Sequence, residues 1–276
     1  MIGVYIEAGF CNRVFKMVFA YIFSKKYSVP FRFEGWEKNS HHTTQVYEWL
    51  VKRFMDTPLY HKDKIHYTYR WNEPSEDFMN YLDVATLAPS VLTHPTYLYG
   101  FFQNEGYFKD YRTDVLELLK EPEFVTMELD KIRLSMENCY FLHVRLGDYL
   151  QLDKHFIDLT HYYNECIRQI AEKDPHATIL VFSNQINHVS DVYPQLYTSI
   201  HQYGLNFTNV GDMDEILGFY LMIRCFKGGI CSNSTYSWWA SWLNQNPNKT
   251  VFMPSKWINM NVNGVVYPDY ATIINV

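Results

Sequence analysis

The chain has 276 residues, of which 47% are hydrophobic and 18% aromatic, enough apolar material for one large or two small folded cores. Its net charge is −6, with both signs mixed along the sequence and no Lys/Arg block of the kind that binds nucleic acid. We therefore expect a folded globular protein and exclude a nucleic-acid partner.

Neither a membrane span nor a metal site is indicated. No apolar run approaches the roughly 20 residues needed to cross a bilayer, and the apolar start is interrupted too early for a signal peptide. The five cysteines are an odd number without a Cys-x-x-Cys pair, so neither a disulfide framework nor a zinc site is predicted. His41, His42, His61 and His66 lack the paired helical spacing of metal ligands. Reduced thiols favour the cytoplasm.

The first half of the chain alternates between strand and helix patterns. Apolar β-branched residues predict a strand at 2–6, and a turn of small residues leads to Asn12, which is suited to capping a helix that continues to about Lys26. The remaining elements predicted here are strands at 29–33 and 97–103, a helix at 45–54 and a helix ending at Leu119. The region 35–90 is otherwise irregular.

The second half continues the alternation. Helices are predicted after Pro122 to about 137, at 160–171 and at 213–225, and strands from 139 and at 178–182, 228–231 and 250–253. Such alternation predicts parallel sheets with helical crossovers. We expect two α/β halves, one domain at 1–135 and a second at 136–276.

The strand that begins at Cys139 runs into the seven residues HVRLGDY at 143–149. This strand end carries a fixed positive charge on Arg145, a permissive backbone at Gly147 and an acid at Asp148. Because ligands bind at the carboxyl ends of the strands in open α/β sheets, we expect a site here.

A second candidate stretch, at 232–243, begins with hydroxyl residues and continues as a helix with three tryptophans. The free N–H groups and the dipole of a helix N-terminus favour an anion, so this stretch could cradle a phosphate. Alternatively, Ser234 or Thr235 is only the cap of the helix.

Arg145 and this helix start could meet across the sheet and clamp a diphosphate from two sides. The sequence lacks Gly-rich nucleotide loops and the hydrolase elbow, which favours sugar transfer from a nucleotide diphosphate.

The turn between the first strand and the first helix offers a third position. Gly9 and Asn12 could present N–H groups to an anion or a sugar hydroxyl, or form a tight turn and a helix cap that touch no ligand. The aromatic residues of the strand at 97–103 belong most simply to the core, but Gln103 and Asn104 fall just beyond the strand end and could lie at a cleft.

Five blocks along nearly the whole chain match the motifs of one enzyme family. AGFCNR at 8–13 resembles Gly-Gly-Leu-Gly-Asn-Gln/Arg, and YGFFQ at 99–103 with Tyr107-Phe108 resembles Gly-Tyr-x-Gln…Tyr-Phe. Residues 143–149 resemble His-x-Arg-Arg-Gly-Asp-Tyr, Tyr162-Tyr163 a Tyr-Tyr helix, and 233–243 the block Asn-Ser-Ser-Phe-Ser-Trp-Trp-x-x-Trp-Leu. On these blocks the chain resembles glycosyltransferase family 11, the α-1,2-fucosyltransferases.

The resemblance implies a GT-B-type α/β fold of two Rossmann-like domains facing a cleft, and a metal-independent inverting transfer from GDP-fucose without a cofactor. The domain at 1–135 would bind the glycan acceptor and the domain at 136–276 the nucleotide sugar. Arg145 would hold the donor β-phosphate and neutralise the leaving group. The residues that would shape or line the same site are His143, Asp148, Ser234, Thr235 and Ser237. Gly9 and Asn12 would face the reaction centre from the N-terminal half.

The resemblance names no base for the acceptor hydroxyl. Asp148 and Glu7 are the carboxylates nearest the motifs, although Asp148 could simply hydrogen-bond its own turn. Leu146 replaces the second Arg of the family motif, which removes one positive charge near the diphosphate.

The nucleotide-binding helix departs from the family pattern. Gly218 stands where the family has an Asp expected to recognise guanine, and loss of such a contact costs about 1.5–3 kcal/mol. Asp214, one turn earlier on the same helix face, could take its place. Asn184 stands where the family often has an acid.

Three functions remain open on the sequence. The preferred one is α-1,2-fucosyl transfer from GDP-fucose to a glycan hydroxyl. The first alternative is a deoxysugar donor linked to UDP or dTDP, and the second is a non-catalytic glycan- or nucleotide-binding protein. The acceptor and the oligomeric state do not follow from the sequence. Because no signal anchor is recognised, we expect a cytosolic enzyme of microbial or viral origin.

Overall fold

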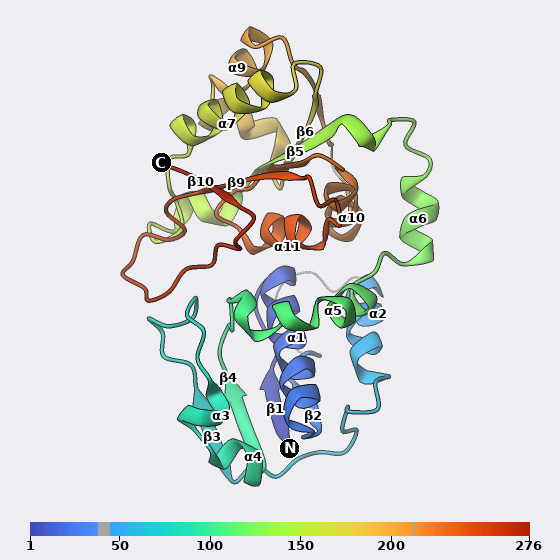
Figure 1. Cartoon of the computed structure of the whole chain (residues 1–276), viewed down its shortest axis with the longest axis vertical. Helices are drawn as coiled ribbons and strands as arrows, with labels where there is room; N and C mark the ends of the chain where they lie inside the picture. Colours follow the sequence, from blue (N-terminus) through green and yellow to red (C-terminus); the bar gives the residue numbers. More distant parts are fainter. Residues whose placement is uncertain (38–44, 212) are drawn as a thin grey trace. The chain divides into compact units, whose positions relative to one another are not determined.

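A computed structural model describes residues 1–37, 45–211 and 213–276 of the chain (Figure 1). His41 and His42 lie outside these described residues. The chain divides into two compact units. Unit 1 is Met1–Lys120 with Asn261–Tyr267, and unit 2 is Glu121–Met260 with Pro268–Val276.

The first unit therefore ends at Lys120, before the boundary expected at 135. The reason lies in helix α6 (Glu123–Leu129), which packs on α10 (Glu215–Arg224) of unit 2. The Arg224 guanidinium is 2.5 Å from a carboxylate oxygen of Glu121 and 2.8 Å from one of Asp130. These ion pairs hold both ends of α6 to unit 2.

Unit 1 contains a four-stranded sheet in the order β2-β1-β4-β3, with every pair of neighbours parallel. Its elements in chain order are β1 (Ile2–Tyr5), α1 (Phe10–Tyr27), β2 (Phe31–Glu34), α2 (Gln45–Met55), β3 (Tyr69–Asn72), α3 (Val84–Leu87), α4 (Ser90–Thr93), β4 (Thr96–Tyr99), the 3-10 turns η1 (Glu105–Tyr107) and η2 (Lys109–Tyr111), and α5 (Arg112–Leu118).

The hydrophobic pattern located most of unit 1. The predictions for β1, β2, α1 and α2 are confirmed to within a few residues. The strand predicted at 97–103 is too long, because β4 ends at Tyr99 and the chain turns with Phe102 in the left-handed region at φ 53°. β3 was not predicted, since it is a mostly exposed edge strand without an apolar run.

Unit 2 contains a six-stranded parallel sheet in the order β10-β9-β8-β5-β6-β7. After α6, its elements are η3 (Met136–Asn138), β5 (Cys139–Val144), η4 (Gly147–Gln151), α7 (Thr160–Lys173), β6 (Thr178–Ser183), η5 (Ile186–His188), α8 (Val189–Val192), α9 (Leu196–Gln202), β7 (Asn206–Asn209), α10, β8 (Gly228–Ile230), α11 (Thr235–Leu243), β9 (Thr250–Pro254) and β10 (Thr272–Ile274).

Helices cover both faces of this sheet. Figure 1 shows α7 and α9 on one side of β5 and β6, and α10 and α11 on the other. The side chains of Trp238, Trp239 and Trp242 on α11 are at most 1% exposed, so this helix is buried nearly all round. At Gly229 in β8, a Cβ would lie 2.3 Å from the carbonyl oxygen of Phe141, and the close strand pairing therefore requires glycine.

Unit 2 differs from the sequence prediction at several elements, including the short helices α8 and α9, which were not predicted. The helix predicted to reach about 137 ends at Leu129, and the short strands β7 and β10 were not predicted because both are largely exposed. Within the described residues, no helix is long and apolar enough to cross a bilayer.

Candidate active site

The candidate site of unit 2 lies where the order of the strands reverses, with β6 and β7 added on one side of β5 and β8, β9 and β10 on the other. β5 pairs with β6 on one side and with β8 on the other, and both pairs are parallel. The carboxyl ends of β5 and β8 therefore mark a switch point, the place at which ligands bind in open α/β sheets. Residues 145–149 follow β5 and residues 231–234 follow β8, so both predicted motifs meet at this edge.

A buried hydrogen bond joins the two motifs. The imidazole Nδ1 of His143, at the end of β5, is 3.0 Å from the hydroxyl oxygen of Ser237 on α11. The Tyr163 hydroxyl donates to the His143 carbonyl oxygen at 2.9 Å. Burial, helped by the charge of Arg145, lowers the pKa of His143 to about 3, so the ring is neutral near pH 7. His143 is thus a fixed structural link between β5 and α11.

Arg145 lies beside Asp148 and Tyr149. Its Nη2 is 2.6 Å from Asp148 Oδ1, and its guanidinium is 5.3 Å from the centre of the Tyr149 ring. The side chains of Arg145 and Asp148 are 31% and 56% exposed, and an ion pair this exposed contributes only about 0–1 kcal/mol. A diphosphate could therefore replace Asp148 as the partner of Arg145 at little cost. The described interaction of the Asp148 carboxylate is thus with Arg145, which lies three residues earlier in the same turn.

Asn184 holds the turn that carries Arg145. Its Oδ1 accepts a hydrogen bond from the Leu146 N–H at 2.8 Å, and its Nδ2 donates to the Leu146 carbonyl at 3.3 Å. Gly147 has φ 65°, and a Cβ there would lie 2.6 Å from Asn184 Nδ2. The side chain of Leu146 is 0% exposed in the hydrophobic core, which explains why an Arg is absent from this position. The amide of Asn184 is therefore engaged by the protein backbone.

The hydroxyl-rich stretch forms the start of α11. Ser234 is the N-cap, and its Oγ accepts a hydrogen bond from the Tyr236 N–H at 3.4 Å. Ser237 Oγ lies 3.3 Å from the Ser234 carbonyl oxygen, to which it donates. The capping role considered for Ser234 is thus present, while Thr235 in the first turn is half-buried beside it. The helix dipole places a partial positive charge at this same sheet edge.

Tyr236 explains the space available at Gly218. A Cβ on Gly218 would lie 3.1 Å from the Tyr236 hydroxyl oxygen, and that hydroxyl donates to the Glu215 carbonyl oxygen at 2.5 Å. The Tyr236 ring is 5.4 Å from the His143 ring. A side chain at 218 would therefore be crowded by the Tyr236 hydroxyl, and Tyr236 itself replaces the Phe of the family motif.

Asp214 is the N-cap of α10. Its Oδ1 accepts hydrogen bonds from the N–H groups of Ile216 and Leu217, at 2.9 and 3.3 Å. One carboxylate oxygen of Asp214 is thus used in starting the helix.

Unit 1 has a switch point of its own, between β1 and β4. Helix α1 begins here, with Gly9 as its N-cap and no side-chain capping bond, so the prediction that Asn12 caps the helix is wrong. Asn12 lies inside the first turn, and its Oδ1 accepts a hydrogen bond from Gln103 Nε2 at 3.0 Å. No atom of the described residues lies within 4 Å of the position that a Cβ on Gly9 would take.

Two charged residues at this edge were missed on the sequence. Lys16 follows Asn12 by four residues on α1, and Glu73 directly follows β3; both side chains are buried. Lys16 could have been found from its spacing, because residues four apart share a helix face and Lys16 therefore lies on the same face as Asn12. Glu73 gave no signal, since β3 itself was not recognised.

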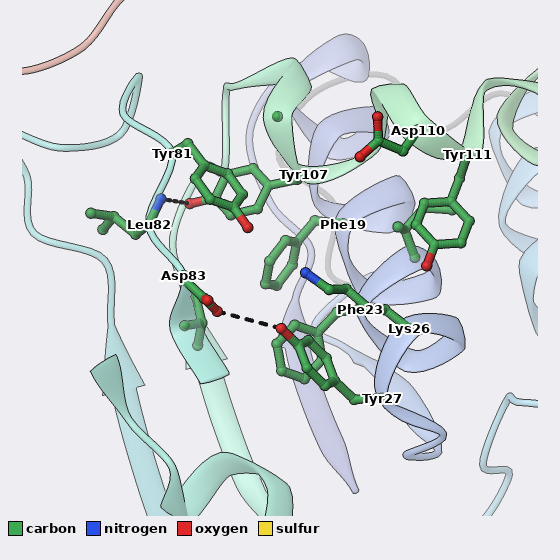
Figure 2. Close-up of a pocket in the computed structure, with 13 residues that line it drawn as sticks. Phe19, Phe23, Lys26, Tyr27, Tyr81, Leu82, Asp83, Tyr107, Asp110 and Tyr111 are labelled. Atoms are coloured by element: carbon green, nitrogen blue, oxygen red, sulfur yellow. Dashed lines mark hydrogen bonds between the residues drawn. The ribbon is translucent and has the colours of Figure 1, made fainter. Parts of the chain in front are cut away.

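Unit 1 also contains an aromatic pocket of about 330 Å³ (Figure 2). The C-terminal half of α1 supplies one wall through Phe19, Phe23 and Tyr27, and Tyr81 and Tyr107 lie opposite. The Tyr27 hydroxyl is 3.4 Å from Asp83 Oδ1, and Tyr107 accepts a hydrogen bond from the Leu82 N–H. None of the predicted site residues lines this pocket.

The described residues contain no group of three His, Cys, Asp or Glu side chains placed to hold a metal ion. All five cysteines are buried free thiols. At the site of unit 2, the Arg145 guanidinium and the start of α11 both offer positive charge to an anion.

Two α/β units with parallel sheets, each with polar residues at a switch point, define a glycosyltransferase fold of the GT-B type. The structure superposes on Arabidopsis thaliana FUT1, a mutant form in complex with GDP, with a TM-score of 0.52 and 10% identity over 91% of this chain and 69% of that one. It superposes on POFUT1 in complex with GDP-fucose with a TM-score of 0.51 and 13% identity over 91% and 97% of the chains. At these identities the likeness concerns the fold alone.

The chain belongs to glycosyl transferase family 11, whose sequence profile matches residues 49–262. It is similar to the Escherichia coli O-antigen biosynthesis glycosyltransferase WbnK, with 27% identity over 175 residues, 59% of this chain and 56% of that protein. It is also similar to an Escherichia coli alpha-1,2-colitosyltransferase, with 26% identity over 166 residues, 57% and 54% of the two chains. The matched regions span a little over half the length of these curated relatives.

Proposed function

We propose that the protein is an inverting α-1,2-fucosyltransferase that moves fucose from GDP-fucose to a hydroxyl of a glycan. Membership of family 11 supports glycosyl transfer. The names of the relatives support a bacterial surface glycan as acceptor and a deoxysugar in an α-1,2 linkage. The observation that carries the proposal is the buried His143–Ser237 bond, because it fixes the Arg145 turn against the start of α11.

In this proposal Arg145 is the residue that handles the leaving group. Its guanidinium donates to the β-phosphate as the bond to the sugar breaks, and the N–H groups at the start of α11 and the hydroxyls of Ser234 and Thr235 surround the same phosphate. The hydroxyl of Ser237 is buried and supports this site through its bond to His143. Charge-assisted hydrogen bonds stabilise by about 1.5–3 kcal/mol each. Two of them at the β-phosphate would accelerate departure of the nucleotide by several orders of magnitude, and the proposed transfer uses no metal ion.

Asp148 and Asn184 have supporting roles. Asp148 orients the guanidinium of Arg145 before the donor binds, and Asn184 holds the backbone turn. Asp214 keeps the first turn of α10 in place near Gly218. We infer that Gly9 and Asn12 belong to the acceptor side in unit 1. We also place the reaction in the cytoplasm, where the five free thiols would remain reduced.

The test has two arms. In the first, thermal-shift titrations with GDP, UDP and dTDP identify the nucleotide, and stabilisation by UDP or dTDP but not GDP would replace the GDP donor by the alternative one. In the second, transfer from GDP-fucose to a β-galactoside is measured for wild type, Arg145→Ala and the control Arg168→Ala on the solvent face of α7. We expect Arg145→Ala to abolish transfer and the control to retain it. Nucleotide binding without turnover in the wild type would instead indicate a non-catalytic binding protein.

A further inference from the structure

The carboxyl edge of the unit 1 sheet contains a buried carboxylate, Glu73, that forms no ion pair with any of the described residues. Glu73 is 9% exposed and follows β3. Its Oε2 accepts hydrogen bonds from the N–H groups of Phe101 at 2.6 Å and Phe102 at 3.2 Å. Among residues 1–37, 45–211 and 213–276, the one donor to its Oε1 is the Phe102 N–H at 3.2 Å. A carboxylate oxygen has two lone pairs, so Oε1 retains the capacity to accept a further hydrogen.

Lys16 supplies a buried cation at the same edge. Its side chain is 1% exposed, and its Nζ lies 4.7 Å from the centre of the Phe101 ring and 5.8 Å from that of Tyr99. Within the described residues its ammonium makes no hydrogen bond or ion pair, and its charged neighbours are Glu7, Glu73 and Arg13. A buried ammonium with three unfilled donors is costly unless a substrate accepts its hydrogen bonds or the group gives up its proton.

Both groups titrate near neutrality. Burial raises the pKa of Glu73 to about 7, even though the two backbone N–H groups and Lys16 favour its charged form. Burial likewise lowers the pKa of Lys16 to about 8. The other groups facing Glu73 are Asp77 in the loop that follows it and Tyr107 in η1. A carboxylate whose pKa lies near the working pH is suited to accept and release a proton.

Further polar side chains lie at the same edge of the unit 1 sheet. The amides of Asn12 and Gln103 hydrogen-bond to each other, and the Tyr99 hydroxyl donates to Glu7 at 2.5 Å. These side chains follow β1 and β4, on either side of the switch point, or start α1. Amide, phenol and carboxylate groups of this kind recognise sugar hydroxyls.

We propose that Glu73 is the base that takes the proton of the acceptor hydroxyl, with Lys16 as the cation that controls its charge. The inference rests on the glycosyl transfer proposed above and adds the residue that the sequence could not name. The acceptor oxygen forms a bond to C1 of the donor sugar, and the bond from C1 to the diphosphate oxygen breaks with its electron pair on the phosphate. The acceptor proton passes to Glu73 and later leaves to water.

A purely structural explanation for Glu73 is that it anchors the Phe101–Phe102 turn. Glu73→Gln separates the two, because the amide oxygen can still accept the backbone N–H groups but cannot take a proton. We expect the folded variant to lose about 100-fold or more in kcat with little change in KM for the acceptor. The matched control is Glu76→Gln, in the same loop with an exposed side chain, which should behave as wild type.

The pH profile of Lys16→Met gives a second readout that an anchor would not move. Loss of the neighbouring positive charge should raise the pKa of Glu73, so the acid limb of kcat/KM shifts to higher pH. The titration of Glu73 can be followed directly by NMR of the ¹³C-labelled side chain, with or without turnover. This variant retains Glu73 and keeps the proposal testable if Glu73→Gln does not fold.

The outcomes separate this inference from the proposed function. If wild type and Glu73→Gln transfer sugar equally well, or the acid limb stays in place in Lys16→Met, Glu73 is not the base and the transferase assignment stands. If wild-type protein transfers sugar from no nucleotide sugar, the transferase assignment itself is overturned, and the base assignment with it.

Discussion

His143 and Ser237 are 94 residues apart in the chain and meet through a 3.0 Å hydrogen bond at the carboxyl edge of the unit 2 sheet. The bond is buried and joins the strand that leads to Arg145 to the helix that starts at the same sheet edge. It therefore holds the two parts of the proposed phosphate site together before any ligand is present.

Ser237→Ala should weaken both stability and donor binding. The substitution leaves the buried Nδ1 of His143 without its partner, which costs about 1–3 kcal/mol. Urea unfolding should show this loss, and nucleotide affinity should fall with it. Ser190→Ala, at an exposed position of α8, serves as the control and should change neither quantity. An unaltered unfolding midpoint in Ser237→Ala would show that the bond contributes nothing.

Asp148→Asn should leave turnover largely intact. Because Asp148 pairs with Arg145 in an exposed position, its loss should change the free energy of unfolding by less than about 1 kcal/mol. The KM for the donor should rise a few-fold, since Arg145 is less well oriented. Steady-state kinetics with varied donor would check this. A fall in kcat of about 100-fold would instead make Asp148 the base.

Gly218 and Tyr236 should be energetically coupled. Alanine favours a helix over glycine by about 1 kcal/mol, but its Cβ at 218 would crowd the Tyr236 hydroxyl at 3.1 Å. Gly218→Ala should therefore be more favourable in the Tyr236→Phe background than in wild type. A double-mutant cycle by thermal or urea unfolding measures the difference. If the two changes in unfolding free energy were strictly additive, the Tyr236 hydroxyl would be able to move away from the added Cβ without cost.

The buried His143 should make stability depend on pH between about 3 and 6.5. Its pKa is lowered to about 3 in the folded protein, against 6.5 for an ordinary histidine. As the pH falls through this window, His143 binds a proton in the unfolded chain but not in the folded protein, so the free energy of unfolding falls. The slope is at most about 1.4 kcal/mol per pH unit. Unfolding of His143→Asn at several pH values should lack this contribution, and a slope equal to that of wild type would contradict the low pKa.

Sequence patterns predicted the elements that bury an apolar face and failed for those that do not. β1, β5 and α1 have clear periodicity, and both motifs at the unit 2 switch point were found because each follows an apolar strand. β3 is a mostly exposed edge strand, so Glu73 at its end could not be placed. Asn184 lies 38 residues from the turn that it holds, and no local pattern reports a hydrogen bond of that range.

The return of residues 261–267 to unit 1 limits how the enzyme can be re-engineered. Asn263 Nδ2 donates to Asp77 Oδ1 at 2.8 Å, Asn104 Nδ2 donates to the Val265 carbonyl oxygen at 3.4 Å, and Gly264 bridges to Met79. A seven-residue clasp from late in the chain thus completes unit 1, the unit proposed to bind the acceptor. Any chimera that exchanges this unit between relatives to change the glycan acceptor must transplant the clasp together with residues 1–120, or leave the loop after Glu73 without its support.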